Sequence, residues 1–138
     1  MIKERSFNRA DRDKYNRTGL SNIYWELFDS QDSIGSAFNF MEREPVLILD
    51  DIVRAHPHWR PCVEIGYVSK RVGDLLGLTS WSPYRVGKGI RLKCLNKKKR
   101  MFIVTELVLR GVERIAVSDK YIEFDTDTYL HGKAFYIR

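Results

Sequence analysis

The sequence has few cysteines and no long apolar run. Its 138 residues include only Cys62 and Cys94, so it has no disulfide framework, and we expect a reducing compartment. The longest apolar runs, PVLILD at 45–50 and MFIV at 101–104, fall far short of the roughly 20 residues needed to cross a bilayer. The first 18 residues carry charges of both signs and lack the apolar segment of a secretory signal. We therefore expect a cytoplasmic protein with no membrane partner.

The common catalytic motifs are also missing. The sequence contains no glycine-rich phosphate loop, no serine nucleophile motif and no HExxH zinc motif. We therefore assign no catalytic residue, no cofactor and no metal, and the sequence favours a protein that is not an enzyme.

Acidic residues are absent from one long segment. The 31 residues between Asp74 and Glu106 contain no acid and eight basic residues, although the net charge of the whole chain is only +6. The other 107 residues hold sixteen basic and eighteen acidic side chains and are net negative by two. Concentrated positive charge of this kind attracts polyanions to one face of a protein. The eight residues are Arg85, Lys88, Arg91, Lys93, Lys97, Lys98, Lys99 and Arg100.

The first half of the chain has mainly helical signals. Residues 1–18 have little to bury and predict a flexible N-terminal arm, followed by a single globular domain over 19–138. Apolar residues four apart predict a helix over 20–28 and a second over 33–44 that Pro45 ends. Residues 45–53 fit either a buried strand or the start of a helix after Asp50 or Asp51. Two prolines predict a loop at 56–61, and a helix within 63–78 should end at Gly77.

The second half has strand signals. Apolar and charged residues alternate over 90–94, and residues 96–99 read as a polar turn before a return strand at 100–109. Further strands are predicted at 112–117, 120–124 and 134–138. The predicted fold class is therefore α+β, with a helical N-terminal half followed by an antiparallel β-meander.

Residues 80–104 leave two structures open. Val72, Gly73 and Gly77 suit the first helix and turn of a DNA-binding helix-turn-helix, and a clipped recognition helix over 83–88 with a wing at 96–100 would complete a winged helix. However, Gly87 and Gly89 would each cost that helix about 1 kcal/mol relative to alanine. We therefore favour a loop that leads into a β-hairpin with a basic tip.

Both structures predict a nucleic-acid-binding regulator or accessory protein, with DNA favoured over RNA. The segment 85–100 would contact phosphates, because lysine and arginine suit that role, and Trp81 and Tyr84 would stack on unpaired bases. The alternative is an inhibitor or adaptor whose basic face docks on an acidic protein surface. The predicted nucleic-acid-binding residues are Trp81, Tyr84, Arg85, Lys88, Arg91, Lys93, Lys97, Lys98, Lys99 and Arg100.

Two clusters could carry metal chemistry. His56, His58 and Cys62 are suitable zinc ligands, but they lack the paired spacing of structural zinc sites, so we assign no metal to them. Glu123, Asp125 and Asp127 would share one face of a strand, where carboxylates can hold magnesium in a nuclease. A solvated strand face explains the same pattern and is the interpretation we favour, which leaves a metal-dependent nuclease as a second alternative function.

Overall fold

The computed structural model describes residues 20–127 and 134–137, and the predicted arm at 1–18 lies outside them. No helix in these two ranges is long and apolar enough to cross a membrane. The chain forms, in order, η1 (Trp25–Phe28), α3 (Ser36–Phe40), α4 (Arg43–Ala55), β1 (Val63–Ile65), α5 (Lys70–Leu75), β2 (Gly89–Lys93), α6 (Lys97–Leu109), β3 (Arg114–Val117), β4 (Tyr121–Asp125) and β5 (Ala134–Ile137).

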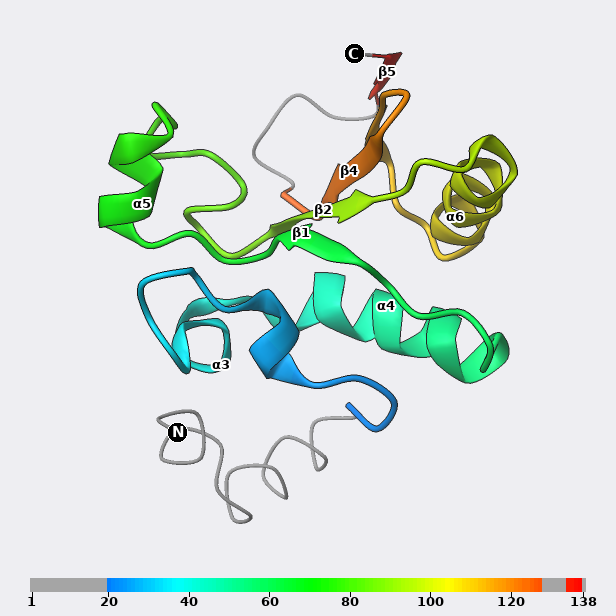
Figure 1. Ribbon diagram of the computed structural model, residues 1–138, viewed down its shortest axis with the longest axis horizontal. Coiled ribbons are helices and arrows are strands. Elements are labelled where there is room, and N and C mark those ends of the chain that lie inside the picture. The colour runs from blue at the N-terminus through cyan, green and yellow to red at the C-terminus, as the bar shows by residue number, and fades with distance from the viewer. Residues whose placement is uncertain (1–19, 128–133, 138) are drawn as a thin grey trace.

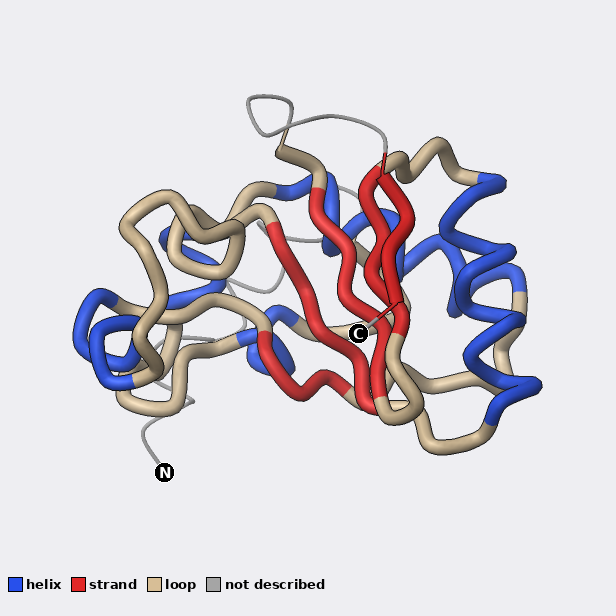
Figure 2. The backbone as a smooth tube through the Cα atoms, turned by 90° about the horizontal axis from the view of Figure 1, so that it is seen from above, coloured by secondary structure: helices blue, strands red, loops and turns tan. Residues whose placement is uncertain are grey.

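The strands form one sheet in the order β1-β2-β4-β3-β5. All neighbouring pairs are antiparallel except β3 and β5, which are parallel. The structure confirms the α+β class and an antiparallel arrangement of β1 to β4. The strand order is not that of the predicted meander, because α6 connects β2 to β3 and β5 pairs parallel to β3. The strands lie side by side across the centre of the molecule, with α5 and α6 at opposite ends (Figures 1 and 2).

Helix α6 connects two strands that do not touch. Both β2 and β3 pair antiparallel with β4, so they are parallel to each other with β4 in the gap between them. A parallel pair needs a long crossover connection, and α6 supplies it. This arrangement places the end of β2, the start of α6 and the β3–β4 turn at the same end of the strands.

One face of the sheet forms the core. Ile90 and Leu92 on β2 and Ile122 on β4 are fully buried, because alternate side chains of a strand point to the same face. Helix α4 runs across this face (Figure 1). It contributes Val46, Leu49 and Ile52 to the core, and α6 contributes Ile103 and Leu107.

The predicted turn and return strand over 96–109 are wrong, because this segment is the helix α6. The side chain of Asn96 caps the helix by accepting a hydrogen bond from the Lys99 N–H at 2.9 Å. Gly111, with φ +84°, follows the end of the helix in the left-handed conformation typical of that position. The basic run 97–100 is therefore the first turn of a helix and not the tip of a hairpin.

The N-terminal helices are shorter than predicted, because tertiary contacts compete with them. Over 20–28 only the 3-10 turn η1 forms, since buried Asp50 accepts hydrogen bonds from the N–H groups of Asn22 and Ile23 at 2.6 and 3.1 Å. Pro45 does not end a helix. It lies in the first turn of α4, where a missing N–H costs no hydrogen bond. Residues 45–53 are neither a strand nor the start of a helix after Asp50 or Asp51, because α4 already begins at Arg43.

A winged helix-turn-helix does not form over the described residues 63–104. The strand β1 and the six-residue α5 occupy 63–75, and Gly77 ends α5 with φ +73°, as predicted. Residues 83–87 form turns in place of a recognition helix. Gly87 is essential to this path: its φ is +76°, and an added Cβ would lie 2.5 Å from the Phe40 carbonyl oxygen.

Candidate nucleic-acid interface

The eight basic residues of the acid-free segment fall into two groups. Arg85, Lys88 and Arg91 form ion pairs with acids from elsewhere in the chain. The other five lie at the end of β2 and in the first turn of α6, and no ion pair joins them to an acid within the described ranges. Only this second group adds net positive charge to the surface. It comprises Lys93, Lys97, Lys98, Lys99 and Arg100.

Arg91 belongs to a buried network on the sheet face opposite the core. Its guanidinium donates to the carboxylate of Glu123, directly across from it on β4, and lies 3.6 Å from Glu64. It also lies over the ring of Tyr121, 4.2 Å from the centroid. Burial alone would lower the pKa of Arg91, but its hydrogen bond to Glu123 raises it. The charge of Arg91 is therefore already compensated inside the protein.

Tyr84 belongs to the same network. Burial and its hydrogen bond to Glu123 raise the pKa of its hydroxyl, and the ring helps to line a small cavity of about 110 Å³ on this face. The ring therefore stabilises the sheet face, and nothing in its placement makes it a platform for a base.

Arg85 and Trp81 belong to the segment that follows α5, and α5 lies at the end of the molecule remote from α6 (Figure 1). Arg85 donates to Asp74 Oδ1 at 3.0 Å and to the Leu78 carbonyl at 2.8 Å, which closes the turn after α5. Trp81 lies in the same turn with 64% of its surface exposed. Lys88 is 3.9 Å from Asp127. The structure thus separates these residues from the lysines of α6.

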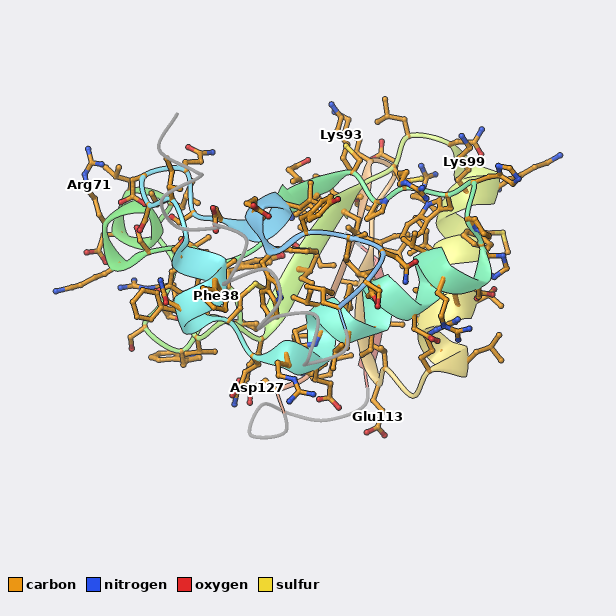
Figure 3. All side chains as sticks on the ribbon, turned by 90° about the horizontal axis from the view of Figure 1, so that it is seen from below. Phe38, Arg71, Lys93, Lys99, Glu113 and Asp127 are labelled. Atoms are coloured by element: carbon orange, nitrogen blue, oxygen red, sulfur yellow. The ribbon has the colours of Figure 1, made fainter. Side chains whose placement is uncertain are left out.

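A groove of about 830 Å³ lies beside the end of β2 and the first turn of α6. Arg60, Lys93 and Lys99 line it, together with Trp59, and none of its lining residues in the described chain is acidic. Lys93 and Lys99 extend from the same side of the molecule (Figure 3). The groove therefore combines positive charge from three segments with one aromatic ring.

Hydrogen bonds fix the backbone around this groove. The Lys93 N–H donates to the Cys62 carbonyl at 2.8 Å, which joins the ends of β1 and β2. Arg100 donates to the carbonyls of Cys94 and Asp119 at 2.9 and 2.7 Å, which ties α6 to the β3–β4 turn. This turn also carries exposed Lys120. The charges are therefore held on ordered elements.

Trp59 is half-buried and packs against α6. Its ring makes an edge contact with Phe102, with 6.0 Å between the centroids, and His56 makes a second edge contact with Phe102 at 4.9 Å. Arg60 donates to the carbonyls of Pro57 and Trp59 at 2.6 and 2.9 Å, which orders the loop between α4 and β1. The loop predicted from its two prolines is thus confirmed, and it forms one wall of the groove.

The candidate zinc ligands do not converge. His56 Nε2 lies 2.9 Å from Glu106 Oε1 and takes part in the contact between α4 and α6. His58 and Cys62 are exposed residues near the groove. Within residues 20–127 and 134–137, no three or more His, Cys, Asp and Glu side chains are grouped so that they could hold a metal ion.

The acidic residues on and just after β4 are buried, so a solvated strand face is the wrong interpretation. Glu123, Asp125 and Asp127 each expose less than a tenth of their surface. Arg114 donates to Asp125 at 3.0 Å, and the Asp127 N–H donates to the same carboxylate at 3.1 Å. Burial nonetheless raises the pKa of Asp125. These carboxylates serve as partners for arginine and lysine side chains.

The sequence alone did not indicate Trp59, Arg60 or Lys120 as site residues. All three are distant in the sequence from the lysine run. Trp59 and Arg60 line the groove because β1, which follows their loop, pairs with β2, and Lys120 lies in the β3–β4 turn that Arg100 ties to α6. A Trp-Arg pair in a proline-rich loop is a local signal, but it acquires meaning only when the position of the loop is known.

Comparison with family models, with curated proteins and with solved structures gives no match for this chain.

Proposed function

We propose that this protein binds nucleic acid through the groove between the α4–β1 loop, the end of β2 and the first turn of α6. The observation that carries the proposal is the acid-free lining: Arg60, Lys93 and Lys99 come from three segments and surround one space. Phosphate contacts supply most of the affinity in such complexes, and lysines and arginines whose charge no acidic side chain compensates are the groups that make them. We expect the protein to act in the cytoplasm as a small regulator or accessory factor.

Trp59 favours nucleic acid over an acidic protein surface as the ligand. An acidic protein would be attracted by the same charges, but an aromatic ring between cationic side chains is the usual arrangement for stacking on a base. The ring is fixed by Phe102, so it would lose little conformational freedom on binding. DNA and RNA remain to be distinguished by experiment, with DNA as our expectation.

Salt dependence of binding tests the proposal. Binding of the full chain to duplex DNA, single-stranded DNA and RNA oligonucleotides would be measured by fluorescence anisotropy over a range of salt concentrations. The double variant Lys93→Gln, Lys99→Gln removes two phosphate contacts. It should reduce the slope of log affinity against log salt by about 1.8 for a duplex and about 1.4 for a single strand.

A matched control is offered by α5. Lys70→Gln, Arg71→Gln removes the same charge from the opposite end of the molecule, where Arg71 is labelled in Figure 3. This control should retain the salt slope of the unmodified protein. Equal losses in both variants would assign binding to overall charge and not to the groove. No binding to any oligonucleotide at about 50 mM salt, where phosphate contacts are strong, would overturn the proposal.

A further inference from the structure

The groove beside β2 and α6 has an apolar wall as well as cationic side chains. Trp59 in the α4–β1 loop is half-buried, and Leu95, just after β2, exposes 65% of its surface. The apolar lining residues are Ala55, Pro57, Trp59, Leu92, Leu95 and Ile103. A ligand that offered only negative charge would leave this apolar surface in contact with water, which is unfavourable.

The apolar and cationic lining residues differ in depth. Leu92 and Ile103 are buried and lie on the side of the groove that faces the core. Arg60, Lys93 and Lys99 are exposed, and Lys93 and Lys99 extend outward on the same side of the molecule (Figure 3). The groove is therefore apolar toward the core and cationic toward solvent.

This arrangement matches an unpaired strand better than a duplex. An unpaired strand can turn the face of a base toward an aromatic or apolar surface while its phosphates contact cationic side chains. In a duplex the bases are stacked in the interior, and only their edges are accessible from the grooves. A duplex would therefore meet the cationic side chains but not the apolar wall.

The concave shape of the site also favours a single strand. Proteins that read duplex DNA usually insert a projecting α-helix or two-stranded β-ribbon into its major groove. Here Lys93 and Lys99 line a recess of about 830 Å³, and the segment 97–100 is the first turn of a helix that Arg100 ties to the β3–β4 turn. A recess of this size lies in the range of about 300 to 1,000 Å³ that encloses small ligands, and it suits a short stretch of one strand.

We infer that the groove binds single-stranded nucleic acid in preference to a duplex, with one unpaired base packed against Trp59 and Leu95. The phosphates on either side of that base contact Arg60, Lys93 and Lys99. This inference rests on the proposed function and narrows its ligand class. Unpaired bases are common to single-stranded DNA and RNA, and the 2′-hydroxyl is the group that distinguishes the two.

Arg60 can bind a phosphate without giving up its own contacts. Its hydrogen bonds to the carbonyls of Pro57 and Trp59 are both donated by Nη1. A guanidinium has five N–H donors in a fixed planar arrangement, so a phosphate can be bound at Nη2 while the loop stays ordered. The cationic rim of the groove is therefore formed in part before the ligand arrives.

Fluorescence anisotropy of the full chain with four matched ligands tests the preference. The ligands are a DNA strand, the RNA strand of the same sequence, the DNA strand annealed to its complement, and an abasic strand that keeps the phosphates and lacks the bases. At about 50 mM salt, the single strands should bind about tenfold or more tightly than the duplex or the abasic strand. Whichever single strand binds more tightly identifies the sugar, and either order supports the inference.

Trp59 variants test the contact with the base. Trp59→Ala should lower the affinity for the single strands by about 5- to 150-fold and leave the affinity for the abasic strand unchanged. Trp59→Phe keeps an aromatic ring and should recover most of the loss. Trp81→Ala changes an exposed tryptophan in the turn after α5 and should bind like the unmodified chain.

Tryptophan emission tests the same contact with the Trp59 ring in place. In a Trp81→Phe background the remaining tryptophans are Trp59 and the buried Trp25. Saturation with a single strand should quench the emission, and saturation with the abasic strand should not. The quenching should be absent when Trp59→Phe is added.

The possible failures of the two proposals differ. A duplex or an abasic strand that binds as tightly as the single strand would overturn the inference, and so would a single strand that binds without changing the Trp59 emission. Either result would leave the proposed function standing, because nucleic acid is still bound. If none of the four ligands binds, the proposed function fails and this inference fails with it.

Discussion

Arg91 and Glu123 are directly opposite each other on β2 and β4, and the guanidinium donates to the carboxylate on the sheet face turned away from the core. Tyr121 covers the guanidinium and Tyr84 contacts the carboxylate. One-fifth or less of either side chain is exposed. The pair therefore joins the centre of the sheet by a hydrogen-bonded ion pair with little access to water.

Breaking this pair should destabilise the fold. Arg91→Met leaves the Glu123 carboxylate buried without its guanidinium, and we expect a loss of about 3 to 5 kcal/mol in the free energy of unfolding, measured by urea denaturation. Lys93→Met replaces another basic residue of β2 with methionine, at an exposed site two positions further along the strand, and should cost less than about 0.5 kcal/mol. The double variant Arg91→Met, Glu123→Leu should recover much of the loss. Equal stability of the two single variants would contradict the role assigned to the pair.

Substitutions at Gly87 and Gly77 distinguish the cost of left-handed backbone strain from the cost of a steric clash. Both have positive φ, but nothing lies within 4 Å of a Cβ built on Gly77, whereas one on Gly87 would meet the backbone of Phe40 and Met41. Gly77→Ala should therefore cost only the strain of the left-handed conformation, about 1 to 2 kcal/mol. Gly87→Ala should cost more, because two segments must also move apart. Thermal and urea unfolding would rank the two variants, and the reverse order would show that the 83–87 turns adapt freely.

Lys99→Glu should stabilise the protein while it weakens nucleic-acid binding. Lys99 is three residues after the cap Asn96, the position where glutamate completes a capping box and interacts favourably with the helix dipole. We expect a gain of about 0.3 to 1 kcal/mol at low salt that decreases as salt rises. Lys120→Glu makes the same charge change outside a helix and serves as the control. A loss of stability at Lys99→Glu would show that this lysine has a structural role.

The contact between α4 and α6 should make stability depend on pH. Arg110 and, to a lesser extent, His56 donate to Glu106 and lower its pKa below the ordinary value of 4.5. A carboxylate with a lowered folded-state pKa contributes stability that is fully present above the unfolded-state pKa and is lost as the pH falls through the folded-state pKa. Glu106→Gln should therefore be less stable than the unmodified chain at about pH 5.5, and the difference should shrink at about pH 3. A difference that does not change between these pH values would exclude Glu106 as the titrating group.

Much of the sheet could be predicted from the sequence, but α6 could not. Alternation identifies β2, where Ile90 and Leu92 face the core. Over 100–109, in contrast, apolar residues occupy both sides of either structure, so the pattern does not separate helix from strand. The remaining signals were the length of the run and Asn96 as a cap. The exposed stripe of Met101, Val108 and Leu109 is the physical reason for the error, because it removes the polar face by which a surface helix is identified.

The candidate site shows the same limit. Arg91 and Lys93 have similar contexts in the sequence, because they are two residues apart and occupy the same face of β2. Yet Arg91 is buried against Glu123, whereas Lys93 lines a groove. The difference comes from Glu123 and Tyr84, which the fold brings to Arg91 from separate segments. Charge density along the chain indicated a single basic segment, but only tertiary structure divides its charges into internal and external ones.

The position of β4 has a consequence for how the protein is made. This strand lies between β2 and β3, yet it leaves the ribosome after both of them. Until residue 125 has been synthesised, β2 and β3 have no common neighbour and the core under them lacks Ile122 and Phe124. In a nascent chain that stops before β4, β2 and β3 should therefore each have an unpaired edge. Cooperative folding should begin only after β4 has left the exit tunnel.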